Sequence, residues 1–245
     1  MRTLRFYIPQ DLSVGDKFQA PENVSRHILQ VLRLRLNDEV TLFNGNNVEY
    51  LAVISDISKK KLLLEIRQQQ EISRESKTKI HLVQSISKGD RMDWVVQKAV
   101  ELGVSSIQPV ISHRTVVNLS SERGEKKLRH WQGIAIAACE QCGRNHLPEI
   151  LPIVSLESLL PKFAEDKQSH KLILNPYSEQ RIQTTDFNMD SFVLLVGPEG
   201  GLDDQEVSAV EQAGFNSYKM GPRILRTETA AISCITLLQA LQGDL

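Results

Sequence analysis

Two short stretches near the end of the chain, residues 192–202 (FVLLVGPEGGL) and residues 220–229 (MGPRILRTET), decide the fold class. Each places glycine and proline directly after a strand-like run, and a helical pattern follows within a few residues. This pattern is typical of a strand that ends in a tight loop, where parallel sheets bind ligands beyond the carboxyl ends of their strands. Glycine lets the backbone approach a ligand closely, whereas proline fixes φ and lacks an N–H group. The two loops together predict one ligand pocket.

Strand and helix patterns alternate from residue 79 to the end of the chain. Continuous runs of Val, Ile and Leu are typical of strands buried on both faces, and their alternation with amphipathic helices predicts a parallel sheet in an α/β domain. Strands are predicted at residues 79–86, 105–111, 171–175, 192–197 and 216–220. Helices are predicted at residues 90–104, 122–142, 203–213 and 229–241.

The first 70 residues predict a smaller, mainly β domain. Strand patterns lie at residues 4–9, 40–43, 48–54 and 60–66, and a helix is predicted at residues 23–34. Asn and Gly at residues 44–47 favour a hairpin because both tolerate positive φ. The polar stretch 67–79 (RQQQEISRESKTK) predicts a linker. We therefore expect domains at residues 1–70 and 71–245.

The composition is that of a globular protein, with 245 residues of which 41% are hydrophobic and 24% are charged. The start of the chain lacks the apolar core of a signal peptide, and no apolar run approaches about 18 residues, so neither secretion nor a membrane span is predicted. Three cysteines do not make a disulfide framework. These features favour a cytoplasmic location.

Charge is divided unevenly along the chain. Residues 1–147 carry 22 Lys and Arg against 16 Asp and Glu, whereas residues 148–245 carry 7 against 14. A basic part joined to an acidic part is compatible with a polyanionic partner such as nucleic acid, because phosphate contacts supply most non-specific affinity. Solvated surface charge without a partner is the alternative.

Common cofactor and catalytic motifs are missing from the sequence. GPEGG does not have the spacing of a dinucleotide-binding fingerprint, and no P-loop string occurs. Cys139, Cys142 and His146 offer three possible zinc ligands without a convincing fourth, so no metal is expected. The loop pocket near the C-terminus is therefore the strongest candidate site.

A series of motifs runs along nearly the whole chain in a fixed order. They are LRFYIP at 4–9, HILQVLRL at 27–34, DWVVQKAVELGV at 93–104, SIQPVISHRT at 106–115, EQCGR at 140–144, LLVGPEGGL at 194–202 and GPRILRTETA at 221–230. Together they resemble the bacterial ribosomal RNA small subunit methyltransferase E family. The last two motifs are the most specific.

The resemblance implies a fold and an activity. The fold is an N-terminal PUA-like β-barrel domain that contacts RNA, followed by a SPOUT-type α/β methyltransferase domain with a parallel sheet and a deep C-terminal trefoil knot. The activity is S-adenosylmethionine-dependent methylation of N3 of a specific uridine in the decoding region of 16S ribosomal RNA, on the assembled 30S subunit, by a homodimer without metal or membrane. Two alternatives stay open: another SPOUT methyltransferase acting on a ribose 2′-oxygen, or a non-catalytic ribosome-assembly factor.

The resemblance also assigns expected roles to residues of the loops. The cofactor is expected to lie against Leu174, Asn175, Pro176, Gly197, Pro198, Glu199, Gly200, Gly201, Met220, Gly221, Ile224, Leu225 and Thr229. Removal of the uracil N3 proton calls for a carboxylate base and a nearby cation. Arg226 is the candidate cation, and Glu199 and Glu228 are the candidate bases. The alternative for Glu228 is a favourable charge in a first helical turn.

The expected RNA contacts are basic residues spread over both domains. They are Arg5, Arg26, His27, Arg33, Arg35, Arg114 and Arg144. Arg144 could instead contact a second subunit. For each of these residues taken alone, the alternative to an RNA contact is an ordinary charged side chain on a solvated surface.

Overall fold

The computed structural model describes residues 4–58, 61–115, 121–182, 187 and 189–245. The chain forms two compact units. Unit 1 comprises Met1–Glu75 together with Cys139–Leu147, and unit 2 comprises Ser76–Ala138 together with Pro148–Leu245. The first boundary therefore lies five residues beyond the expected position. Residues 139–147, which carry the EQCGR motif, belong to unit 1 although they follow the first part of unit 2 in the sequence.

Unit 1 is built on a five-stranded sheet with the order β1-β3-β4-β5-β2. The strands are β1 (Arg5–Tyr7), β2 (Lys17–Gln19), β3 (Glu39–Phe43), β4 (Val48–Ser58) and β5 (Lys61–Glu71). The prediction of a small, mainly β domain is confirmed. The expected linker begins too early, because Gln68, Gln69 and Gln70 still pair with β4. A strand continues through polar residues where its backbone can still form hydrogen bonds with a neighbouring strand.

The predicted helix at residues 23–34 is shorter and less regular in the structure. An α-helix, α1 (Glu22–Arg26), continues directly into a π-helical turn, η1 (His27–Val31). Arg33 then adopts a positive φ of 55°, which ends the helical conformation. The apolar spacing predicts an inward face of Val24, Ile28, Val31 and Leu32. Val24 and Ile28 are buried in the core of unit 1 and Leu32 packs against it, whereas Val31, in the π-helical turn, is 67% exposed.

Unit 2 is built on a parallel sheet with the order β12-β10-β11-β6-β7-β8, and β9 also pairs with β7. The strands are β6 (Lys79–Ser85), β7 (Ser106–Ile111), β8 (Glu149–Ile150), β9 (Val154–Ser155), β10 (His170–Leu174), β11 (Ser191–Val196) and β12 (Asn216–Tyr218). The predicted parallel sheet is confirmed. Leu82, Leu194 and Leu195 are completely buried, as expected for central strands covered on both faces.

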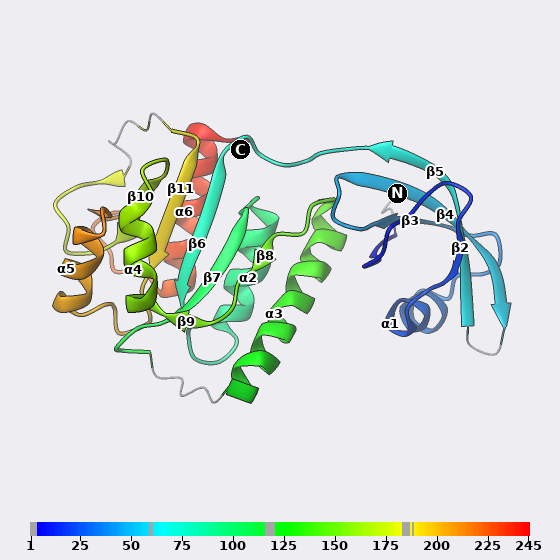
Figure 1. The fold of residues 1–245 in the computed structure, drawn as a ribbon, viewed down its shortest axis with the longest axis horizontal. Coiled ribbons are helices and arrows are strands. Elements are labelled where there is room, and N and C mark those ends of the chain that lie inside the picture. The colour runs from blue at the N-terminus through cyan, green and yellow to red at the C-terminus, as the bar shows by residue number, and fades with distance from the viewer. Residues whose placement is uncertain (1–3, 59–60, 116–120, 183–186, 188) are drawn as a thin grey trace. The chain divides into compact units, whose positions relative to one another are not determined.

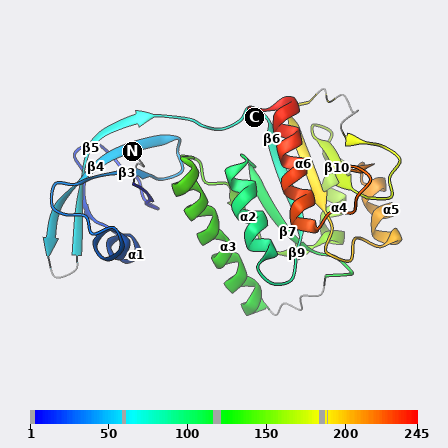
Figure 2. The ribbon, with the colours of Figure 1, turned by 180° about the vertical axis from the view of Figure 1, so that it is seen from behind.

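Helices cover both faces of this sheet (Figures 1 and 2). They are α2 (Arg91–Glu101), α3 (Ser121–Cys142), α4 (Leu156–Glu165), α5 (Asp204–Gln212) and α6 (Thr227–Gln242). Helices α4 and α5 lie on the face toward the viewer in Figure 1, and α2 and α6 lie on the face that Figure 2 shows in front. None of the helices in the described ranges is long and apolar enough to cross a membrane.

Helix α4 has no counterpart among the predicted elements. It begins at Leu156, is capped by Ser155, whose side chain accepts a hydrogen bond from the Ser158 N–H, and contains Pro161. Proline lacks an N–H group and normally interrupts a helix, which masks the apolar spacing of Leu156, Leu159 and Leu160. Packing of those leucines in the core of unit 2 stabilises the helix despite the proline.

The order of three neighbouring strands positions the candidate site. Strand β10 lies between β11 and β12, and all three run in the same direction. Leu174, the last residue of β10, pairs with Tyr218, the last residue of β12. The loops that leave these strands therefore start at the same edge of the sheet, as the two Gly-Pro stretches predict.

Candidate functional site

A cavity of about 1030 Å³ lies at this edge, among the loops that follow β10, β11 and β12. Thirteen residues are predicted to bind the cofactor, and all of them except Thr229 line this cavity: Leu174, Asn175, Pro176, Gly197, Pro198, Glu199, Gly200, Gly201, Met220, Gly221, Ile224 and Leu225. Thr229 instead lines a smaller neighbouring cavity. The fold therefore brings the three loops into one pocket.

The floor of the cavity comes from strand ends that the motif search did not select. Ile173, Val196 and Tyr218 all line it, and each is the last or next-to-last residue of its strand. The pairing of Ile173 with Leu195 and with Ser217 places these strand ends side by side. The rule that parallel sheets bind ligands at their carboxyl ends could have identified these three residues once the strands were predicted.

Two positions in the loop after β11 require glycine, each for a different structural reason. A Cβ atom on Gly197 would lie only 3.2 Å from the backbone nitrogen of Leu202, so a larger residue would push the loop apart. Gly201 has a φ of 69°, a left-handed conformation that glycine adopts without steric cost. The loop is thus tightly folded, and its backbone faces the cavity.

A buried chain of hydrogen bonds connects this loop to β6 and to α6. The Thr227 hydroxyl donates to the Gly197 carbonyl oxygen at 2.8 Å. Because its single proton is used there, it accepts from Gln84 Nε2 at 3.0 Å. Gln84 is completely buried, so loss of these hydrogen bonds would leave buried polar groups with neither a protein partner nor water to bond with. These contacts fix the start of α6, and with it Arg226 and Glu228, relative to the loop.

The smaller cavity, of about 660 Å³, lies between the start of α2 and the start of α6. Its lining is Lys88, Gly89, Asp90, Arg91, Trp94, Arg226, Glu228, Thr229, Ile232 and Ser233. Three of these residues, Arg91, Arg226 and Glu228, also line the larger cavity. The two cavities therefore meet at a guanidinium and a carboxylate that the sequence nominated for catalysis.

The first candidate base, Glu199, is already engaged. Its Oε1 atom accepts hydrogen bonds from the Lys88 backbone N–H at 2.9 Å and from Arg91 Nη1 at 2.5 Å. Burial raises the pKa of this carboxyl, but hydrogen bonds from its own N–H, from Lys88 and from Arg91 outweigh burial and hold the pKa below its ordinary value. Glu199 therefore joins the loop after β11 to the start of α2.

The second candidate base, Glu228, has different surroundings. Its Oε2 atom is buried and has no hydrogen-bond partner among the described residues. A buried carboxylate oxygen without a donor is costly, and such an atom at a cavity wall is the position where a ligand donor would be satisfied. Arg226, two residues earlier, is exposed at the same junction. The geometry therefore favours Glu228 over Glu199 as the base.

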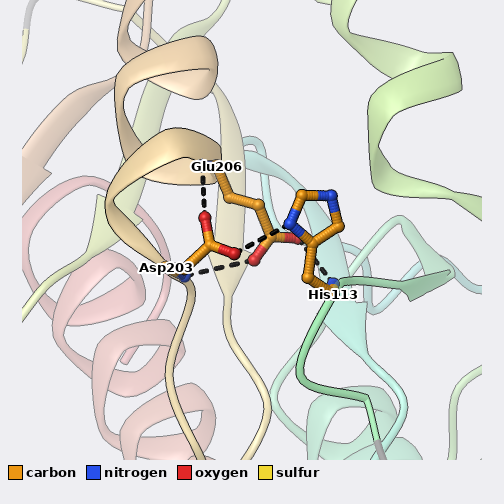
Figure 3. A group of neighbouring side chains, drawn as sticks. All are labelled: His113, Asp203 and Glu206. Carbon is orange, nitrogen blue, oxygen red and sulfur yellow. Dashed lines mark hydrogen bonds and ion pairs between the residues drawn. The ribbon is translucent and has the colours of Figure 1, made fainter.

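A histidine and two carboxylates join the loop after β7 to the start of α5 (Figure 3). His113 Nδ1 lies 2.8 Å from Asp203 Oδ2, and the His113 backbone N–H donates to Glu206 Oε1 at 2.8 Å. Asp203 and Glu206 also form a reciprocal capping box at the N-terminus of α5. The hydrogen bond to Asp203 is the main reason why the pKa of His113 is raised.

These three side chains form the single group of potential metal ligands among the described residues. All four carboxylate oxygens and His113 Nδ1 already take part in the capping box and the His113 contacts, so we assign the group a structural role. The neighbouring Arg114, a predicted RNA contact, donates from Nη1 to the Gly200 carbonyl oxygen at 2.9 Å. The loop after β7 thus supports the middle and the C-terminal end of the loop that carries GPEGG.

The predicted RNA contacts of unit 1 divide into two groups. Arg26, His27, Arg33 and Arg35 are all exposed and lie on α1, on η1 or in the turn that follows. The exposed apolar side chain of Val31 lies on the same segment. This segment therefore presents several cations on one stretch of surface, and its role in RNA binding stays a prediction.

Arg5 and Arg144 belong to the second group, because both side chains are buried. Arg144 Nε donates to Glu75 Oε1 at 2.9 Å, and its side chain is only 4% exposed. Arg5 donates to the Glu49 carboxylate and to the Gly143 carbonyl oxygen. Both arginines therefore tie residues 139–147 into unit 1, which argues against the predicted RNA contact for either.

The positive charge that the sequence places in residues 1–147 does not lie mainly in unit 1. Unit 1 carries 12 Lys and Arg against 11 Asp and Glu, so it is nearly neutral. The excess of positive charge lies in residues 76–138 of unit 2, with 10 Lys and Arg against 5 Asp and Glu. The basic surface therefore includes the unit that carries the two cavities.

Comparisons with known proteins agree with this architecture. Residues 74–239 match the family model of an RNA methyltransferase domain, and residues 21–67 match that of an RNA methyltransferase PUA domain. A ribosomal RNA small subunit methyltransferase E from Buchnera aphidicola is 36% identical over 100% of this chain and 98% of its own length. The Bacillus subtilis protein of that name is 27% identical over 96% of each chain.

Solved structures give the same result. A structure from Legionella pneumophila, in complex with the cofactor S-adenosylmethionine, superposes with a TM-score of 0.95 at 41% identity over 100% of both chains. A ribosomal RNA small subunit methyltransferase E from Neisseria gonorrhoeae, bound to S-adenosylmethionine, gives a TM-score of 0.91 at 42% identity over 99% of both chains. The matches span both units and both loop motifs, and the chain therefore belongs to the ribosomal RNA small subunit methyltransferase E family.

Proposed function

We propose that this protein uses S-adenosylmethionine to methylate N3 of one uridine in the decoding region of 16S ribosomal RNA, on the assembled 30S subunit. The observation that carries the chemistry is the junction of two cavities at Glu228 and Arg226. Family membership supports ribosomal RNA as the substrate. The exact base, atom and particle come from the resemblance and are what the experiment below tests.

The residues of the larger cavity fit S-adenosylmethionine. Its volume of about 1030 Å³ suits a ligand of this size, since binding cavities commonly measure about 300–1,000 Å³. Leu174, Met220 and Leu225 provide apolar walls for an adenine ring, and the tight loop at Gly197 brings backbone groups close. Glu228 adds a negative charge beside a positively charged ligand. Two related structures of high similarity contain this cofactor.

When bound, S-adenosylmethionine supplies the methyl group as a sulfonium, whose carbon–sulfur bond breaks toward sulfur as the carbon–nitrogen bond to uracil forms. Glu228 accepts the N3 proton through its unpartnered oxygen, so the nitrogen attacks with its electron pair free. Arg226 stabilises the negative charge that spreads to the uracil carbonyl oxygens. The loops contribute by holding both reactants in line.

Two structural proposals accompany this function. We propose a deep trefoil knot formed by the loops that follow β10, β11 and β12, as the family resemblance implies, and the shared edge at which these three parallel strands end supports it. We also propose a homodimer, because Tyr177 and Ile224 at the rim of the larger cavity are 85% and 75% exposed and would be covered by further protein.

The test is methylation of small ribosomal subunits purified from a strain that lacks the enzyme. Labelled S-adenosylmethionine should transfer one methyl group per subunit, and nucleoside mass spectrometry should identify N3-methyluridine. Ribose 2′-O-methylation would instead identify a different RNA methyltransferase. Binding of subunits without any transfer, together with no measurable cofactor affinity, would identify an assembly factor and contradict the proposal.

A further inference from the structure

We propose that the smaller cavity receives the target uracil and that Trp94 is the surface on which the base stacks. This inference rests on the proposed function and adds a substrate-binding site that the loop motifs do not contain. Trp94 lies on α2, about 100 positions before the loops in sequence, and it lines the smaller cavity with Ile232 of α6.

The location follows from the geometry of the transfer. In an in-line displacement, the nucleophile approaches the methyl carbon from the side opposite the sulfur, so the acceptor base needs a space separate from the cofactor. The smaller cavity is such a space, because it meets the larger one at Arg226 and Glu228. A base held there has its reacting edge at the two residues that the reaction needs.

Trp94 has the exposure expected of a stacking surface. Its side chain is 58% exposed, whereas the other tryptophan, Trp131, is 1% exposed and donates a hydrogen bond to Asp93. A large exposed aromatic ring at a cavity wall is the kind of surface on which unpaired bases stack in proteins that bind single strands. Lys98 Nζ lies 5.9 Å from the ring centroid and restrains the indole from one side.

The charge around the smaller cavity suits an RNA strand. Lys88, Arg91 and Arg226 line it together with Asp90 and Glu228, so its cations outnumber its carboxylates. Residues 76–138, which supply Lys88 and Arg91, carry 10 Lys and Arg against 5 Asp and Glu. Phosphates on either side of the target nucleotide would be attracted to this surface. The combination of an aromatic ring with surrounding cations is typical of proteins that hold unpaired nucleotides.

Glu228 gives the cavity a preference for uracil. Its buried, unpartnered Oε2 atom accepts a hydrogen bond from uracil N3–H. Cytosine has no hydrogen on N3, and its nitrogen lone pair would face the carboxylate, which leaves the buried oxygen unsatisfied. Sites that require such a hydrogen bond reject the analogue that lacks it by large factors.

The test compares Trp94→Ala, Trp94→Phe and Leu241→Ala with the wild type. Leu241 is an exposed apolar residue of α6 that lines neither of the two described cavities, so its variant controls for loss of apolar surface. Initial rates are measured against the concentration of unmethylated small subunits, cofactor affinity is measured by calorimetry, and molar mass by light scattering. We expect Trp94→Ala to raise KM for the subunit about 10-fold or more with unchanged cofactor affinity and molar mass, and Trp94→Phe to restore most of the loss.

Two results would overturn the inference while leaving the proposed function intact. One is a Trp94→Ala variant with the KM of the wild type. The other is a Trp94→Ala variant whose loss of activity accompanies a fall in molar mass, which would place Trp94 in an interface between two copies. A wild-type protein that produces no N3-methyluridine would instead contradict the proposed function.

Discussion

Glu199 and Glu228 show how the same residue type acquires different roles from its neighbours. Both line the larger cavity, and both follow a glycine-proline loop in the sequence. Glu199 is held by Arg91 and by a backbone N–H, which stabilises its charged form and weakens it as a base. Glu228 has a buried oxygen that no described residue satisfies. This difference is why we propose Glu228, and not Glu199, as the base.

Substitution of the two glutamates should therefore have different effects. We expect Glu228→Gln to lower kcat about 100-fold or more because the proton acceptor is lost, and to lower cofactor affinity by a much smaller factor because the shape is kept and only the nearby charge is lost. Glu199→Gln should mainly weaken the contact with the start of α2, and so affect stability and KM more than kcat. Steady-state kinetics and cofactor titration of both variants measure this. Equal losses of kcat in the two variants would contradict the assignment.

At the scale of elements, the start of α5 is joined to the loop after β7 through His113, Asp203 and Glu206. The GPEGG loop lies directly before this helix and is also contacted by Arg114. The support of the loop thus depends on a contact between two elements that are 90 residues apart. A histidine in such a contact makes it sensitive to pH.

The contact between His113 and Asp203 should stabilise the fold only over a defined pH range. The pKa of His113 is raised, so its contribution is fully present below the ordinary imidazole pKa of about 6.5 and is lost as the pH rises through the higher folded value. The pKa of Asp203 is lowered, first by the Glu206 backbone N–H and then by His113, so on the acid side the contribution is lost as the pH falls below about 3.9.

A double-mutant cycle with His113→Asn and Asp203→Asn measures this coupling by thermal or urea unfolding. We expect stronger coupling between the two side chains at about pH 5.5 than at alkaline pH, because protonation of His113 adds charge attraction to the hydrogen bond. Coupling of the same size at both pH values would show that the neutral hydrogen bond alone joins the elements.

On the scale of the whole molecule, RNA contacts are expected from both units. The exposed arginines after η1 belong to unit 1, whose total charge is nearly balanced, whereas the larger positive excess belongs to unit 2. Local clusters of cations can bind phosphates without a large net charge, because screening limits each charge to about 8 Å at physiological salt. The two surfaces can therefore contribute separately.

The double variant Arg33→Gln and Arg35→Gln tests the contribution of unit 1. We expect KM for small subunits to rise and cofactor affinity to stay unchanged. The slope of log KM against log salt concentration should fall by about one for each phosphate contact that is lost. The matched control is Lys17→Gln with Arg67→Gln, two cations of the same unit that pair with Glu65. An identical change in the control would show an effect of total charge alone.

The pattern of residues alone determined the parallel sheet and the two ligand loops, and the family resemblance added twelve of the residues that line the larger cavity. These features are local in origin: apolar runs form the central strands, and glycine and proline end them at one edge. The same reasoning placed Val24 and Ile28 of the helix predicted at residues 23–34 on its inward face, but not Val31. The π-helical turn at residues 27–31 and the positive φ of Arg33 that follows it depend on backbone conformations that apolar spacing does not encode.

Only the tertiary structure decided what each polar group does. Arg144 and Glu199 resemble functional residues in the sequence, yet contacts with Glu75 and Arg91 engage their charges. Trp94 resembles an ordinary residue of an amphipathic helix, yet it lines a cavity shared with α6. The physical reason is that the availability of a charge or a ring depends on partners brought together by folding. Those partners lie far away in the sequence, where local patterns carry no information about them.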